Sequence, residues 1–188
     1  NPDLSPEESE NAELALKYSG DDYLFSAAVF QNDVDGLIEW APVGPGGLWQ
    51  PSNVASARME GFELEYSVSL GKLNGLVNYT WLDADDLTTD KRLRKRARRQ
   101  FNVDVDYQQT AALSYGASLK ARGHRYADKA NQDRYAGYGL VDFRAQYQAT
   151  TMLNFTATIS NAFNKKYVEH EGYNEATRGF IVGFDYSL

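Results

Sequence analysis

The segment RGFIVGFDYSL, residues 178–188, decides the fold because its side chains alternate in character with a period of two. One face carries the apolar and aromatic side chains of Phe180, Val182, Phe184, Tyr186 and Leu188. The opposite face carries Ile181, Gly183, Asp185 and Ser187. Alternation of this kind predicts a β-strand with one apolar face.

Eight earlier segments repeat this alternation. They span residues 13–18, 23–29, 62–70, 77–81, 101–107, 113–120, 141–148 and 153–160. Together with the last segment, they predict an all-β, antiparallel chain of about nine strands.

The connections between these segments alternate between short and long. Short turns are expected at residues 20–22, 71–72, 108–110 and 149–151, and long loops at residues 40–57, 83–99, 122–137 and 163–178. In an antiparallel sheet this order places every short turn at one end and every long loop at the other, which is the layout of an outer-membrane barrel. Tyrosines on the apolar faces near the short turns also fit an aromatic girdle at a membrane–water boundary. These are Tyr18, Tyr23, Tyr107, Tyr147 and Tyr186.

The composition of the 188 residues excludes several classes of protein. The chain has no cysteine and only 2 histidines, so it is no disulfide scaffold and offers a poor basis for a metal centre. Its net charge of −7 argues against nucleic-acid binding. We predict no cofactor and no metal site. No apolar run reaches the roughly 18 residues of a membrane helix, and the start at Asn1 without a signal peptide suggests a mature or excised product.

A soluble barrel or sandwich with its apolar face inward would show the same alternation. Two features favour a membrane barrel instead. The apolar face is rich in alanine and bordered by tyrosine, and no compact loop structure is expected to cap a core. A soluble β-barrel binding module stays as an alternative hypothesis.

Five segments resemble, in the same order, those of TonB-dependent outer-membrane receptors. The opening NPDLSPEESENAEL (1–14) resembles their NPxLxPE segment, and QNDVDGLIEW (31–40) resembles the strand that follows it. ARMEGFELEY (57–66) matches an A-x-x-x-G-x-E strand start, while ISNAFNKKYVE (159–169) and GYNEATRGF (172–180) resemble their penultimate N-L-F-[ND]-K-x-Y segment and a Y-N-E-P-G-R loop. The departures are Ala162 for Leu, Ala176-Thr177 for Pro-Gly and Leu188 for the usual terminal Phe.

The resemblance implies that residues 1–188 are the C-terminal part of a 22-stranded receptor barrel, without its lumenal plug, in the outer membrane of a Gram-negative bacterium. It implies energy-coupled uptake of a scarce metal chelate, a ferric siderophore or cobalamin, and no enzymatic activity. The order of segments from QNDVDGLIEW through residue 99 also resembles that of cobalamin transporters.

The resemblance also implies partners. These are outer-membrane lipid and lipopolysaccharide, the TonB energy-coupling protein through an N-terminal region absent from this chain, the metal-chelate ligand, and the barrel-assembly machinery. Gly183, Tyr186 and Leu188 fit the C-terminal signal that the assembly machinery reads.

A basic run, KRLRKRARR at residues 91–99, lies in one of the expected long loops. Its cations would bind the phosphates of outer-leaflet lipopolysaccharide through charge-assisted hydrogen bonds. The candidate lipopolysaccharide-binding residues are Lys91, Arg92, Arg94, Lys95 and Arg96. The alternative is a solvated loop whose cations pair with nearby acids such as Asp83, Asp85, Asp86 and Asp90.

The expected loop at residues 122–137 concentrates arginine and tyrosine. With aromatic residues of neighbouring loops, it would form part of an external ligand site, because such side chains suit a planar anionic chelate. The candidate ligand-binding residues are Trp49, Arg122, Arg125, Tyr126, Arg134, Tyr135 and Tyr173. The alternative is a mobile loop with ordinary surface residues.

Carboxylates gather at the expected strand ends. They are Asp33, Asp35, Glu39, Asp83, Asp85 and Asp86. Their spacing lacks the glycine and glutamate of an EF-hand, so solvated acids are favoured over a calcium site. An outer-membrane enzyme would need a catalytic histidine, for which His124 is the only plausible candidate, and it has no partner at a recognisable spacing. A further alternative is a fragment that serves as a barrel-assembly substrate.

Overall fold

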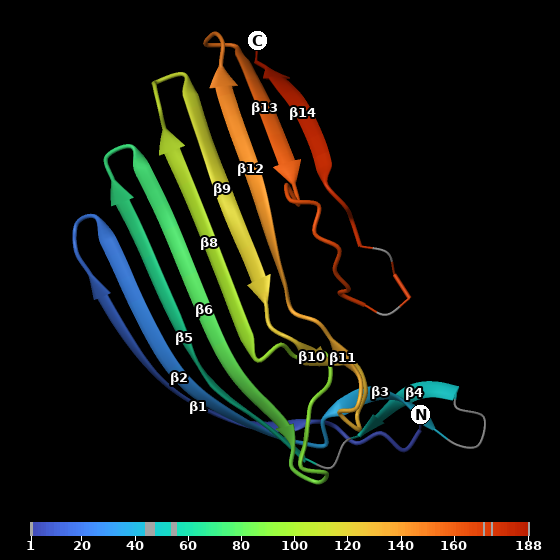
Figure 1. The fold of residues 1–188 in the computed structure, drawn as a ribbon. Helices are drawn as coiled ribbons and strands as arrows, with labels where there is room; N and C mark the ends of the chain where they lie inside the picture. Colours follow the sequence, from blue (N-terminus) through green and yellow to red (C-terminus); the bar gives the residue numbers. More distant parts are fainter. Residues whose placement is uncertain (1, 44–47, 54–55, 171, 174, 188) are drawn as a thin grey trace.

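Nine long strands form one curved antiparallel sheet in the computed structural model (Figure 1). The structure describes residues 2–43, 48–53, 56–170, 172–173 and 175–187. The long strands are β1 (Glu8–Ser19), β2 (Tyr23–Asp35), β5 (Ser56–Leu70), β6 (Leu73–Asp86), β8 (Arg99–Gln108), β9 (Leu113–Arg122), β12 (Tyr138–Gln148), β13 (Leu153–Ser160) and β14 (Gly179–Tyr186). The prediction of an all-β chain of about nine strands is confirmed.

The strands lie side by side in the order in which the chain makes them, β1-β2-β5-β6-β8-β9-β12-β13-β14. Each pairs antiparallel with the next. Within the described part of the chain, β1 pairs only with β2, and β14 pairs only with β13. No helix among the described residues is long and apolar enough to cross a membrane.

The short turns gather at one end of the sheet and the long connections at the other (Figure 1). This confirms the predicted alternation. The sequence analysis expected the long connections to be plain loops, and this expectation is wrong for three of them. They contain the hairpins β3 (Ile38–Val43) with β4 (Leu48–Asn53) and β10 (Arg125–Tyr126) with β11 (Arg134–Tyr135), and β7 (Lys91–Arg92) pairs with β6.

Two of the short turns use the same local device. The Thr110 hydroxyl accepts hydrogen bonds from the backbone N–H groups of Ala112 and Leu113, at 3.2 and 3.0 Å. The Thr150 hydroxyl does the same for Met152 and Leu153, at 3.2 and 3.1 Å. A glutamine two residues before each threonine donates to the threonine carbonyl. Each turn is therefore specified by a Gln-x-Thr sequence within it.

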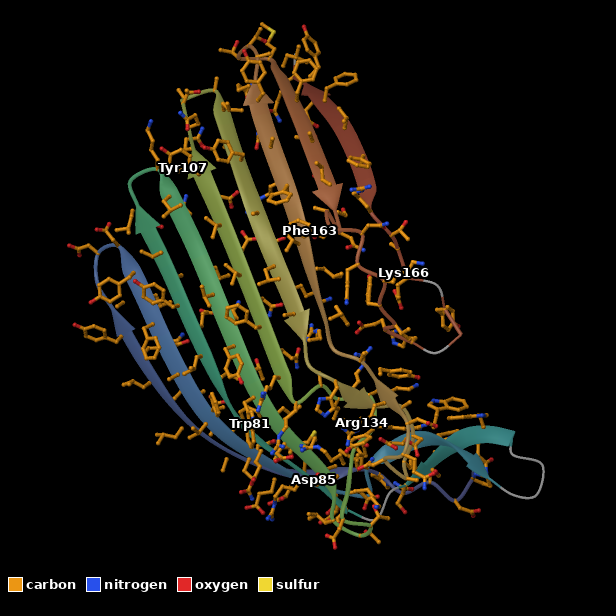
Figure 2. The ribbon with its side chains drawn as sticks, viewed as in Figure 1. Trp81, Asp85, Tyr107, Arg134, Phe163 and Lys166 are labelled. Carbon is orange, nitrogen blue, oxygen red and sulfur yellow. The ribbon has the colours of Figure 1, made fainter. Side chains whose placement is uncertain are left out.

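The apolar face of the sheet is exposed rather than packed against a second layer. Leu14 is 74% exposed and Val182 is 80% exposed. Tyrosine pairs mark the short-turn end of this face, with Tyr107 and Tyr115 rings 5.6 Å apart; Figure 2 labels Tyr107 at that end. Exposed apolar side chains bordered by tyrosine are typical of a strand wall that faces lipid.

A small core lies on the opposite face, at the long-loop end. It consists of Val34, Leu37, Ala57, Ala84 and Leu93, with Met59 and Leu82 against it. The expectation that no compact loop structure caps a core is wrong at this end. The reason is that the strand alternation reverses there: Ala57 and Ala84 lie on the faces that carry Glu63 and Asn78 elsewhere on the same strands, and Leu93 from a loop covers them.

Farther along the polar face, Arg144 of β12 reaches across β9 to two aspartates of β8. Its guanidinium binds Asp104 at 2.6 Å and Asp106 at 2.5 Å. A Cβ on Gly116, which lies between them, would be 2.8 Å from the Arg144 Cζ atom. Glycine at this position thus leaves room for the guanidinium to lie across the strands.

Candidate functional site

Most of the predicted site residues lie at the long-loop end, where the small hairpins pack beside the ends of the long strands. Figure 2 labels Arg134 of β11 and Asp85 of β6 in this region. The side chains here form three groups: an arginine–tyrosine hairpin, a basic run held by carboxylates, and a buried arginine that anchors the last loop.

The hairpin of β10 and β11 repeats the dipeptide Arg-Tyr, and its register pairs each arginine with a tyrosine. Arg125 lies opposite Tyr135, with its Cζ atom 5.2 Å from the ring centroid. Arg134 lies opposite Tyr126 at 5.0 Å and donates a hydrogen bond of 3.1 Å to its hydroxyl. Four predicted ligand residues are therefore brought together as two cation–π pairs.

These two pairs have opposite surroundings. Arg125 is 4% exposed, whereas Arg134 is exposed. Since neighbouring cross-strand pairs project to opposite sides of a hairpin, one pair faces the protein and the other faces solvent. Of the two arginines, only Arg134 is placed to meet a ligand arriving from outside, with the half-buried Tyr126 beside it.

Trp49 and Tyr173 complete the predicted ligand set from other loops. The Trp49 ring lies 5.4 Å from the Arg94 guanidinium, and Arg94 donates to the Trp40 carbonyl. Tyr173 is 75% exposed and lines a separate pocket of the last loop with Lys165, Tyr167 and their neighbours. Trp49 therefore meets a predicted lipopolysaccharide residue rather than the rest of the predicted ligand set.

The basic run is divided between two carboxylates. Glu39 holds Arg94 at 3.6 Å, Arg96 at 3.8 Å and Lys129 at 3.4 Å. Asp83 holds Arg92 and also Arg98, the latter at 2.7 Å. The alternative of paired cations thus describes Arg92 correctly, although Glu39 was not among the acids expected to pair with the run.

The cations of the basic run lie on different faces of the sheet. Arg92 lies opposite Asp85 across β6 and β7, and Arg98 stacks at 5.0 Å on Trp81. Trp81 and Asp85 belong to the apolar face of β6 because they alternate with Leu82 and Ala84. Arg92 and Arg98 therefore form a charged rim beyond the apolar face, whereas Lys95 and Arg96 line a pocket with Leu82.

Arg125 anchors the last long loop to the hairpin. Its Nη2 atom donates to the backbone carbonyls of Val168 and Glu169, at 2.8 and 2.9 Å. It lies 3.7 Å from the Glu169 carboxylate, which also accepts a hydrogen bond from the Tyr138 hydroxyl. Burial raises the pKa of Glu169, but the Tyr138 hydrogen bond and the Arg125 charge outweigh it and hold that pKa below its ordinary value.

Asn131 joins two loops through the backbone of β7. Its side chain accepts from the Arg92 N–H at 2.8 Å and donates to the Arg92 carbonyl at 3.0 Å. Asp128, just before it, accepts three backbone N–H groups, and that of Asp133 contributes most to lowering the Asp128 pKa. The sequence analysis gave no role to Asn131, Glu169 or Tyr138, because each acts on a segment distant in sequence.

The remaining predicted residues have simpler surroundings. Among the described residues, no group of three or more His, Cys, Asp or Glu side chains is arranged to hold a metal ion. His124 lies with its ring 6.5 Å from that of Tyr126. Gly183 and Tyr186 lie in β14, and the Tyr186 hydroxyl is 3.8 Å from the Met152 sulfur. Leu188 lies outside the described residues.

Comparison with known proteins agrees with this geometry. Residues 1–162 match the family model described as TonB dependent receptor-like, beta-barrel. The chain is 36% identical over 193 residues to the vitamin B12 transporter BtuB of Photobacterium profundum, covering 100% of this chain and 31% of that protein. It is 32% identical over 167 residues to BtuB of Vibrio vulnificus, covering 89% of this chain and 27% of that one.

A solved structure supports the same assignment. A mutant of the ferric enterobactin receptor PfeA of Pseudomonas aeruginosa superimposes with a TM-score of 0.79 at 25% identity, covering 100% of this chain and 32% of the receptor. The chain thus spans about a third of the length of the relatives it matches. It belongs to the family of TonB-dependent receptor β-barrels of the Gram-negative outer membrane, and it is a partial receptor barrel rather than an enzyme.

Proposed function

We propose that this chain contributes strands to an outer-membrane receptor for energy-coupled uptake of a metal chelate, and that its ligand is a cobalamin. The observation that carries the proposal is the 36% identity to a vitamin B12 transporter over the whole chain. Identity to the ferric enterobactin receptor is 25%, and that protein is the basis for a siderophore as the alternative ligand.

The geometry supports an external ligand site at the long-loop end. The exposed Arg134, the half-buried Tyr126 and the exposed Trp49 ring offer flat, cationic and aromatic surfaces. Such surfaces suit a planar ligand with anionic or polar groups. Tyr173, on the last loop, would contribute from the side of β13 and β14.

Three further assignments belong to this proposal. Residues 1–188 form the C-terminal part of the receptor barrel, with about 22 strands in the whole. Lipopolysaccharide contacts the rim of Arg92 and Arg98, and TonB acts through a region outside this chain. Gly183, Tyr186 and Leu188 serve as the assembly signal.

The two edge strands of the sheet, β1 and β14, are the reason for including the barrel-assembly machinery among the partners, because strands that lack a neighbour must be joined to others. Strands β1 and β14 each have one neighbour among the described residues, and an odd number of antiparallel strands leaves both running in the same direction. They cannot close antiparallel on one another, so further strands must complete the wall.

The test is ligand binding by the complete receptor in proteoliposomes. Equilibrium binding of radiolabelled vitamin B12 is compared with that of ferric enterobactin. We expect saturable binding of vitamin B12, weakened about tenfold by a Tyr126→Ala, Arg134→Gln double variant, because a cation–π contact and a charge are both lost. Lys17→Gln, at the short-turn end, is the matched charge control. Binding of ferric enterobactin alone would overturn the choice of cobalamin.

A further inference from the structure

A pocket of about 250 Å³ lies where the basic run, the end of β9 and the last loop meet. Its lining residues are Leu82, Lys95, Arg96, Ala97, Gln100, Arg122, Arg125 and Glu169. Four of them are cations and one is an acid. The sequence analysis assigned Lys95 and Arg96 to lipopolysaccharide and Arg122 and Arg125 to the ligand, but the fold brings them into one pocket.

The cations of this pocket are only partly neutralised. Arg125 lies 3.7 Å from the Glu169 carboxylate, and Arg96 lies 3.8 Å from Glu39. The structure shows no ion pair for Lys95 or Arg122 within the described ranges. The pocket therefore concentrates positive charge that the protein itself does not balance.

A second observation points to a missing acceptor. The Nη1 atom of Arg125 is buried and has no hydrogen-bond partner in the described part of the chain, while Nη2 is fully used by the last loop. A buried guanidinium N–H without an acceptor is unfavourable and therefore rare. Arg125 lines the pocket, so an oxyanion bound there would supply an acceptor once the guanidinium turned toward it.

The backbone holds Lys95 in place for the same role. Lys95 has a φ of 61°, in the left-handed region that lysine seldom adopts. Its N–H donates to the Tyr126 carbonyl at 2.8 Å, which holds the basic run against β10. Strained backbone of this kind persists where the surrounding contacts determine it.

We infer that this pocket is a binding site for a phosphate ester. Arg122 and Arg125 are not fully neutralised by the carboxylates that the structure describes. Two such guanidinium groups suit the several oxygens of a phosphate better than the two oxygens of a carboxylate. The volume fits one anionic group rather than a whole ligand, whose pockets span about 300–1,000 Å³. The phosphate belongs either to a lipid headgroup or to a soluble ester; vitamin B12 carries a phosphodiester.

The test measures phosphate binding directly, and so separates this inference from the proposed function on which its soluble arm rests. The complete receptor, in detergent micelles, is titrated with inorganic phosphate while ³¹P line broadening and heat are followed. The variant is Lys95→Gln, Arg122→Gln, because neither side chain holds a loop in place. The matched control is Lys91→Gln, Lys129→Gln, which also removes two charges at the long-loop end but outside the pocket.

We expect the double variant to bind phosphate about tenfold more weakly or worse, and the control to bind within about twofold of the parent, because charge-assisted hydrogen bonds are lost only in the first. Equal weakening in both variants would show general electrostatics and overturn the inference, as would no binding by the parent. Competition by diphosphoryl lipid A assigns the site to a lipid, and competition by vitamin B12 assigns it to a soluble ester. A parent receptor that binds phosphate but does not bind vitamin B12 would contradict the proposed function alone.

Discussion

The two ends of the sheet are held together by different kinds of interaction. At the short-turn end, strands are joined by two to four residues, and the hydroxyls of Thr110 and Thr150 bind N–H groups two and three residues away. At the long-loop end, Asn131 binds Arg92, and Arg125 binds Glu169, across 39 and 44 residues. The first end is organised locally and the second by tertiary contacts.

The difference suits the two environments of a membrane barrel. Tight turns with self-contained hydrogen bonds complete the wall without needing other segments. The external ligand site that we propose needs side chains from several loops at once, and ion pairs with aromatic contacts hold these loops together without a large core. The small core around Ala57 and Ala84 is the only apolar cluster with buried members among the described residues.

The largest expected effect comes from damaging the wall that both ends share. A Cβ on Gly61 of β5 would lie 2.2 Å from the Trp81 carbonyl oxygen, a backbone atom that cannot move freely. We expect Gly61→Ala to lower the free energy of unfolding by about 3 kcal/mol, measured by guanidinium titration in lipid vesicles. Gly139→Ala is the control because its Cβ would meet nothing closer than 3.8 Å. Equal stability of the two variants would show that the β5–β6 contact is looser than described.

The next effect should separate the two ends. Arg125→Met removes the donor to Val168 and Glu169 while keeping an apolar stem under Tyr138. We expect a loss of about 2 kcal/mol, since hydrogen bonds of a charged group are broken, together with faster hydrogen exchange in residues 163–178. Exchange in the short turns should not change. If the short turns also lost protection, the two ends would be one cooperative unit.

Acid should loosen the long-loop end selectively. The pKa of Glu169 is lowered in the folded protein, so its contacts contribute stability above the ordinary value of 4.5, and this contribution is lost as the pH falls through the folded-state pKa. We expect the protection of residues 163–178, measured as the hydrogen-exchange rate relative to the intrinsic rate at the same pH, to fall below about pH 4.5. Glu169→Gln should remove most of this pH dependence, and an unchanged profile in that variant would contradict the assignment.

The smallest effect should come from a single turn. Thr150→Val keeps the shape of the side chain but removes the hydroxyl that accepts from Met152 and Leu153. We expect a loss of about 1 kcal/mol, with faster exchange restricted to the β12–β13 turn. Thr110→Val should reproduce the result in the β8–β9 turn. An effect that reached the long loops would break the division between the ends.

Much of the wall was predictable because it depends on a pattern with a period of two. Phe180, Val182 and Phe184 share a face in any β-strand, whatever the neighbours are. The same holds for turns such as Gly71-Lys72, where glycine takes a φ of 59° between two strands that end and begin beside it. The order of the strands then follows from short and long connections, since consecutive strands of a barrel pair.

At the long-loop end, the sequence predicted which residue types gather there but not which side chains contact one another. Residues 91–99 and 122–137 were recognised as basic and aromatic, and Asp83 was expected as a partner. Glu39 and Glu169 were not, because they come from other loops. The alternation also failed at Ala57 and Ala84, where a covering segment turned a polar face into a small core. Local spacing carries no information about which loops meet.

The sequence by itself therefore determined the all-β fold, the number and order of the long strands, the exposed apolar face and the family, because these depend on periodicity, turn chemistry and motifs within short segments. Only the tertiary structure decided that Lys95, Arg96, Arg122 and Arg125 share one pocket, and that Arg92 and Arg98 lie on the other face. The physical reason is that ion pairs and cation–π contacts act over a few ångströms in space, between residues that the chain separates by dozens of positions.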